Sequence, residues 1–79
     1  MTGQALRAKR AVAGVPGAAI SIRTGIPRSR LSHIERGYLV PTADEVQRIE
    51  SAIDEIIRTK HHLTKLADEA GLSLAGVRL

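Results

Sequence analysis

The sequence predicts an all-α fold: a compact bundle of about five helices that includes a helix-turn-helix and is followed by a C-terminal helical extension. Three observations support this prediction. Apolar residues recur at gaps of three and four, glycines close successive segments, and a capping box opens the last long one. The length of 79 residues allows one small domain, and so short a chain buries only a modest share of its surface. A partner subunit would add to its stability.

The first helix is predicted over residues 4–13, an alanine-rich and basic stretch. Leu6, Arg10 and Ala13 recur on one side of it at helical spacing. Gly14 follows directly and marks the stop.

Two short helices joined by a glycine turn come next. Residues 18–24 form a weak second helix whose Ile20 faces inward, and Gly25 supplies the tight turn because glycine enters left-handed backbone angles at little steric cost. The third helix is expected over residues 27–36, before Gly37 ends it. This arrangement is the helix-turn-helix unit.

A long helix is predicted over residues 43–70. Thr42 and Glu45 form a capping box at its start. At about 1.5 Å per residue the helix would extend roughly 42 Å, so it must either project from a small domain or bend. We expect a bend at residues 59–62, where β-branched and imidazole side chains weaken helix propensity and Lys60 interrupts an apolar stripe. The stripe consists of Val46, Ile49, Ile53, Ile56, Lys60, Leu63, Ala67 and Ala70.

This pattern divides the chain into a helix-turn-helix domain over residues 1–55 and a helical extension over residues 56–79. The extension offers a second apolar surface formed by Ile56, Ile57, Leu63 and Leu66. We favour a homodimer seam as the use of this surface. The alternative is that these residues fold back on their own domain.

Charge is divided unevenly along the chain. Residues 1–40 hold seven Lys/Arg against Glu35 alone, for a net charge of +6, whereas residues 41–79 hold five against seven acids, for a net charge of −2. The basic half indicates a polyanionic partner, and the alternative is a solvated basic surface. Tyr38 is the only aromatic residue, so platforms that stack single-stranded bases cannot be built, and double-stranded DNA is the better partner.

Composition also argues against several other classes of protein. The chain has no cysteine and no apolar run near the roughly 20 residues that span a bilayer, so we expect a soluble, cytoplasmic protein that does not enter the membrane. No nucleophile-and-base pattern is visible, which argues against an enzyme. His61 and His62 are adjacent and point about 100° apart on a helix, so we expect neither a metal site nor a cofactor.

Over residues 6–53 the sequence resembles the phage repressor and Cro type of helix-turn-helix, also called the xenobiotic-response-element family. The marks that carry the resemblance are Arg10, Gly25, the run Arg-Ser-Arg-Leu-Ser-His-Ile-Glu-Arg-Gly at residues 28–37, and Pro41. The resemblance implies a lambda-repressor-like fold with residues 27–36 as the recognition helix. The family joins the positions of Arg10 and Glu35 in a salt bridge, which makes this pair structural.

The resemblance also implies DNA contacts. Side chains expected at base edges in the major groove are those of Arg28, Ser29, Ser32 and His33. Arg28 is the strongest candidate because an arginine fork matches the O6 and N7 acceptors of guanine. Candidates for the phosphate backbone are Lys9, Arg30, Arg36 and Tyr38.

The sequence departs from the family at the start of the second helix. Pro16 and Gly17 stand where a capping residue and a phosphate-binding glutamine are usual. Ser21 replaces a usual alanine, and Pro27 replaces a usual hydroxyl cap. These departures weaken the expected phosphate clamp of the second helix.

The predicted function is a sequence-specific DNA-binding regulator, acting as a repressor and a homodimer of bacterial or phage origin. The alternative is a protein-interaction module, such as an antitoxin, that binds a partner protein through its second half.

Overall fold

The computed structural model describes residues 2–71, and all regular structure within them is helical. The four helices are α1 (Gly3–Val12), α2 (Gly17–Thr24), α3 (Arg28–Glu35) and α4 (Ala43–Glu69). Their bounds agree with the predicted ranges to within one residue at each end. Residues 72–79 of the predicted extension lie outside the described residues.

The expected bend at residues 59–62 is wrong, and with it the count of about five helices. α4 runs unbroken through this segment. Its sequence contains neither proline nor glycine, the usual causes of a sharp kink, and Thr59 Oγ1 donates to Glu55 O at 2.9 Å within the helix. The helix therefore projects, and the molecule measures 45 × 20 × 20 Å.

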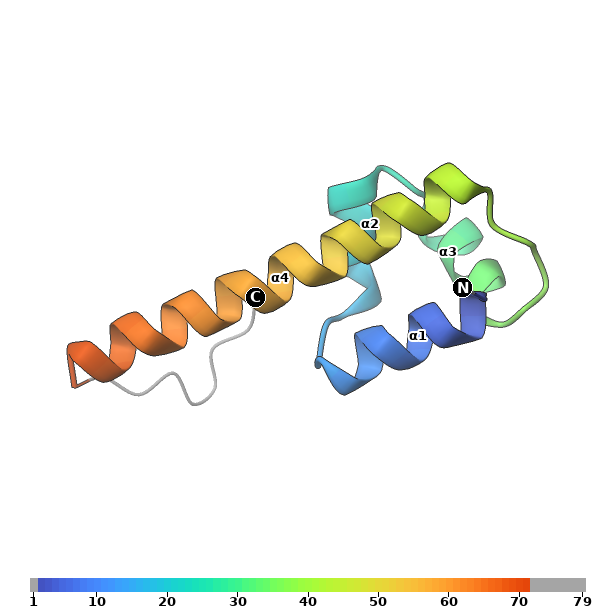
Figure 1. The fold of residues 1–79 in the computed structure, drawn as a ribbon. Coiled ribbons are helices and arrows are strands. Elements are labelled where there is room, and N and C mark those ends of the chain that lie inside the picture. The colour runs from blue at the N-terminus through green and yellow to red at the C-terminus, as the bar shows by residue number, and fades with distance from the viewer. Residues whose placement is uncertain (1, 72–79) are drawn as a thin grey trace.

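Figure 1 shows α1, α2 and α3 gathered around the N-terminal half of α4, while its C-terminal half extends away from them. α1 packs against α3 and α4, and α2 also packs against both of these helices. None of the helices within residues 2–71 combines the length and the apolar composition needed to cross a lipid bilayer.

The core lies where the four helices meet. Its buried apolar residues are Leu6, Val15, Ile20, Ile26, Leu31, Ile49, Ala52, Ile53 and Ile56. Ile56 is 3% exposed, which corrects its assignment to a partner-facing surface: in this fold it fills the core. Ile57 packs against the same core, so the compact domain extends past the predicted boundary at residue 55.

Two glycines allow this packing. Gly25 ends α2 with a φ of 74°, the left-handed conformation that the turn requires. Gly3 lies against the end of α3, and a Cβ at this position would overlap the carbonyl oxygen of Ile34. The absence of a side chain at Gly3 therefore lets α1 begin in direct contact with the α3 backbone.

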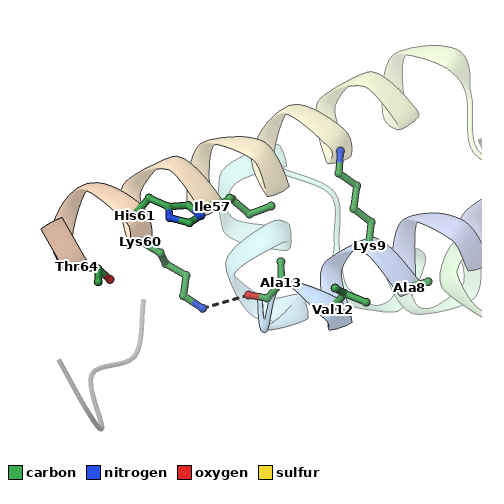
Figure 2. Close-up of a pocket in the computed structure, with 8 residues that line it drawn as sticks. All are labelled: Ala8, Lys9, Val12, Ala13, Ile57, Lys60, His61 and Thr64. Carbon is green, nitrogen blue, oxygen red and sulfur yellow. Dashed lines mark hydrogen bonds between the residues drawn. The ribbon is translucent and has the colours of Figure 1, made fainter.

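α1 and α4 diverge to leave a mainly apolar groove, which we call the α1–α4 groove (Figure 2). It encloses about 610 Å³. Its lining includes Ala8, Val12, Ala13, Ile57, His61 and Thr64. Lys60 crosses one part of the groove, where its Nζ donates to Ala13 O at 3.1 Å, and this bond satisfies a carbonyl at the end of α1. This contact explains how a lysine is accommodated in the apolar stripe.

Candidate nucleic-acid interface

Hydroxyl groups fasten the turn between α2 and α3. Ser21 Oγ donates to Ile26 O at 2.6 Å. Thr24 Oγ1 donates to Ile20 O at 2.7 Å and accepts from Ile26 N at 3.2 Å. Ser21, a departure from the family pattern, therefore holds the turn directly in this chain. The turn fixes the direction in which α3 leaves α2.

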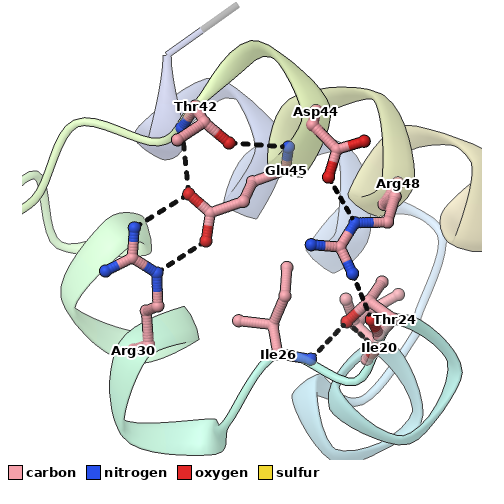
Figure 3. A network of polar contacts seen from close by, with 8 residues as sticks. All are labelled: Ile20, Thr24, Ile26, Arg30, Thr42, Asp44, Glu45 and Arg48. Carbon is pink, nitrogen blue, oxygen red and sulfur yellow. Dashed lines mark hydrogen bonds and ion pairs between the residues drawn. The ribbon is translucent and has the colours of Figure 1, made fainter.

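An arginine from α4 also reaches this turn. Arg48 Nη1 donates to Thr24 O at 2.7 Å, and Arg48 Nε pairs with Asp44 at 2.9 Å (Figure 3). The carbonyl of Thr24 belongs to the last turn of α2, where backbone acceptors lack intrahelical donors. Arg48 therefore ties the end of α2 to α4.

The Arg10–Glu35 pair fixes α3 against α1. Arg10 Nε and Nη2 donate to the two carboxylate oxygens of Glu35, each at 2.8 Å, and Nη1 donates to Val15 O at 2.9 Å. The two side chains are only 18% and 10% exposed. A bidentate pair with so little solvent access defines one orientation of α3. It also neutralises the only acid of the basic half.

The remaining face of α3 is directed outward. Leu31 and Ile34 are buried, whereas Arg28, Ser29 and His33 are exposed and Ser32 is half-buried. The His33 ring lies 6.1 Å from that of Tyr38, measured between centroids. The backbone of the following loop is also held, since Tyr38 N donates to His33 O at 2.9 Å. The four residues predicted to face base edges therefore lie on one accessible helix.

Two of the cations predicted to contact phosphate have internal partners. Lys9 Nζ lies 2.9 Å from Asp54 Oδ1 and 3.5 Å from Glu50 Oε2, and the hydrogen bond to Asp54 is the main cause of a raised pKa at Lys9. Arg30 forms a bidentate pair with Glu45, at 2.6 and 2.9 Å (Figure 3). These contacts direct both side chains toward α4. Arg36 and Tyr38, the other two candidates, are exposed.

Glu45 is held in its ionised form by this arrangement. It is 6% exposed, accepts both hydrogen bonds from Arg30, and accepts from Thr42 N at 2.9 Å in the capping box. These bonds lower its pKa from 4.5 to about 2, with the Arg30 guanidinium as the largest cause. The capping box predicted from the sequence thus also serves as the junction between α3 and α4.

Arg7 is a further candidate for the interface that was not predicted from the sequence. Arg7 lies three residues before Arg10, so the two share a side of α1, and it is exposed beside α3. The i, i+3 spacing was the available signal.

Residues 18–56, which include all of α2 but its first residue, the turn, α3 and the N-terminal half of α4, match the model of the helix-turn-helix family. This segment of the chain is a helix-turn-helix of the phage repressor and Cro type. Neither the curated proteins nor the solved structures contained a match to it. Helix-turn-helix domains of this type bind DNA and are not an enzymatic class. The predicted resemblance is therefore confirmed.

Proposed function

We propose that this protein is a sequence-specific transcriptional regulator that inserts α3 into the major groove of double-stranded DNA. The observation that carries the proposal is the exposed face of α3, held in one orientation by the Arg10–Glu35 pair and the fastened turn. A rigidly held helix with polar groups facing outward suits direct readout of base edges.

In this proposal Ser29, Ser32 and His33 contact bases. Serine hydroxyls donate to or accept from several base edges, and the imidazole of His33 can donate to guanine acceptors. Binding over a promoter would exclude polymerase, so repression is the proposed outcome.

The test is a selection from a random duplex library followed by band shifts on the selected site and on a scrambled one. The wild-type protein should prefer its site by about 10³-fold or more. His33→Ala should cost about 1–3 kcal/mol on the selected site and much less on the scrambled site. An affinity that ignores sequence would contradict the proposal.

We further propose that the protein acts as a homodimer whose half-sites lie about one DNA turn apart. The projecting half of α4 and the α1–α4 groove support this assembly, since Val12 at the rim of the groove is 90% exposed and Leu66 is 47% exposed. Ile57 and Leu63 would join this seam, while Ile56 remains in the core.

The dimer is tested by sedimentation equilibrium of Val12→Asp. Because Val12 is so exposed, the substitution should leave the monomer folded and shift the population from dimer to monomer. Ile22→Asp is the matched control, since Ile22 is 83% exposed but lies on α2, outside the groove. A wild-type protein that sediments as a monomer at high concentration would contradict the dimer.

A second candidate function is capture of a partner protein by the same groove, as in an antitoxin. The size and apolar lining of the groove favour it, because such concave surfaces suit a helix or loop of another protein. A stoichiometric complex with one partner, stable at a salt concentration that abolishes DNA binding and lost in Val12→Asp, would support this function over the dimer.

A further inference from the structure

The cations of the basic half fall into two groups. Four of the seven Lys/Arg in residues 1–40 have carboxylate partners: Lys9, Arg10, Arg23 and Arg30. The other three, Arg7, Arg28 and Arg36, have no carboxylate partner within residues 2–71. All three line one pocket. The cations without an acidic partner are thus gathered in one place rather than scattered over the surface.

This arginine pocket lies between α1, α3 and the start of α2, and encloses about 230 Å³. Ser32 and Gly17 contribute to its wall, and the Arg10–Glu35 pair also lines it. Because Arg10 neutralises Glu35, the three remaining guanidinium groups leave the pocket with a net positive charge. They are exposed, so the pocket is open to a ligand from solvent.

The Arg28 side chain lies beside Gly17 at the start of α2. The Cζ and Nη2 atoms of Arg28 lie 3.7 Å from the position that a Cβ of Gly17 would occupy. The Arg28 guanidinium is therefore folded against the start of α2. Pro16, the N-cap of α2, makes no side-chain hydrogen bond to the helix, so the backbone donors there are not capped by a side chain.

We propose that the arginine pocket binds one phosphate of the DNA backbone, and that Arg28 anchors this phosphate instead of reading a guanine. This inference rests on the proposed DNA-binding function. Guanidinium groups match the geometry of phosphate oxygens. In this chain the clamp is built by arginines from α1 and α3, in place of a side chain at the start of α2.

The experiment measures DNA affinity as a function of salt for the full chain and for Arg7→Ala, Arg28→Ala and Arg28→Lys. Both alanine variants should weaken binding to the selected site and to a scrambled duplex by the same factor, on the order of tenfold. Each should reduce the slope of log affinity against log salt by about one. Arg28→Lys keeps the charge and should keep the slope. Arg58→Ala removes an exposed cation of α4 outside the pocket and should leave both quantities unchanged.

Other outcomes overturn the inference in distinguishable ways. If Arg28→Ala weakens only the selected site, Arg28 reads bases and the proposed function stands without the phosphate pocket. If the alanine variants keep the wild-type slope, no phosphate is bound there. A wild-type protein that binds no duplex would overturn the proposed function and this inference together.

Free inorganic phosphate presents the same oxygen atoms as a DNA phosphate and is the alternative ligand for the arginine pocket. Inorganic phosphate, added at constant ionic strength, should compete only weakly with DNA. If it raises the unfolding temperature of the wild type but not of Arg7→Ala, while the DNA salt slope is the same in both proteins, the pocket serves free phosphate and the DNA assignment is wrong.

Discussion

Two sides of the basic half differ in how their charge is used. On the side that meets α4, Lys9, Arg23 and Arg30 each pair with a carboxylate of that helix. In the arginine pocket, Arg7, Arg28 and Arg36 have no such partner within the described residues. The number of cations in a segment therefore says less about its partner than their positions do, because only the second group is free to meet an external anion.

This comparison changes how the acidic half is understood. In the sequence, seven of the eight acids lie in residues 41–79, apart from the basic residues 1–40. In the folded protein, however, carboxylates of α4 form ion pairs with cations of the basic half. The α4 carboxylates that pair with it are Glu45, Glu50, Asp54 and Glu55. They neutralise one side and leave the arginine pocket as the concentrated positive site.

The largest expected effect on stability comes from the buried pair. Arg10→Ala should lower the free energy of unfolding by about 3–5 kcal/mol, because it leaves the Glu35 carboxylate buried without its partner. It also removes the donor to Val15 O. Urea denaturation followed by circular dichroism measures the loss.

Arg10→Lys is the matched control for this variant. Lysine retains the charge but not the bidentate geometry. The decrease in the free energy of unfolding should therefore be smaller in Arg10→Lys than in Arg10→Ala. A loss below about 1 kcal/mol for Arg10→Ala would mean that solvent reaches Glu35, and that the pair does not fix α3.

An intermediate effect is expected at the junction of α3 and α4. Glu45→Gln should lower the free energy of unfolding by about 1–3 kcal/mol at neutral pH, since glutamine keeps the capping bond to Thr42 but loses the ion pair with Arg30. The folded-state pKa of Glu45 is depressed from 4.5 to about 2. Its contribution is therefore present above pH 4.5 and is lost as the pH falls from 4.5 toward 2.

Denaturation curves between pH 7 and pH 2 measure this dependence. The variant should show a flatter loss of stability over the acidic range than the wild type. Asp44→Asn is the control, because Asp44 is 73% exposed in its pair with Arg48 and should change neither the stability nor the pH profile appreciably. Parallel wild-type and Glu45→Gln profiles would show that the carboxylate titrates normally.

Local signals predicted the helices well. The apolar spacing of Leu6, Ile20, Ile49 and Ile53 identified residues that the structure buries. The glycine at position 25 and the capping box at Thr42 marked boundaries through backbone angles and backbone donors, which depend only on neighbouring residues. The expected bend failed because low propensity does not break a helix that lacks proline and glycine.

The candidate site could be predicted only in part. The ion pair between Lys9 and Glu50 joins residues 41 positions apart, and that between Arg30 and Glu45 joins residues 15 apart. No local sequence pattern identifies partners so far apart in the chain, so Lys9 and Arg30 were both predicted to contact the phosphate backbone. Ile56 was placed on a second surface for the same reason, since helical spacing does not say how far along α4 the core continues.

The smallest effect on stability is expected at Arg23. This residue gives the most direct comparison between the side that pairs with α4 and the arginine pocket. Its pair with Glu55 is 3.2 Å long and about half exposed, so Arg23→Ala should change the free energy of unfolding by about 0–0.5 kcal/mol. Arg23 carries the same charge as Arg7 and Arg28, but that charge is matched by Glu55. Its removal should therefore leave the DNA salt slope within about 0.3 of wild type, whereas each pocket variant lowers it by about one. Equal reductions in all three variants would mean that net charge alone governs binding, and that the pairing with α4 makes no distinction between the two sides.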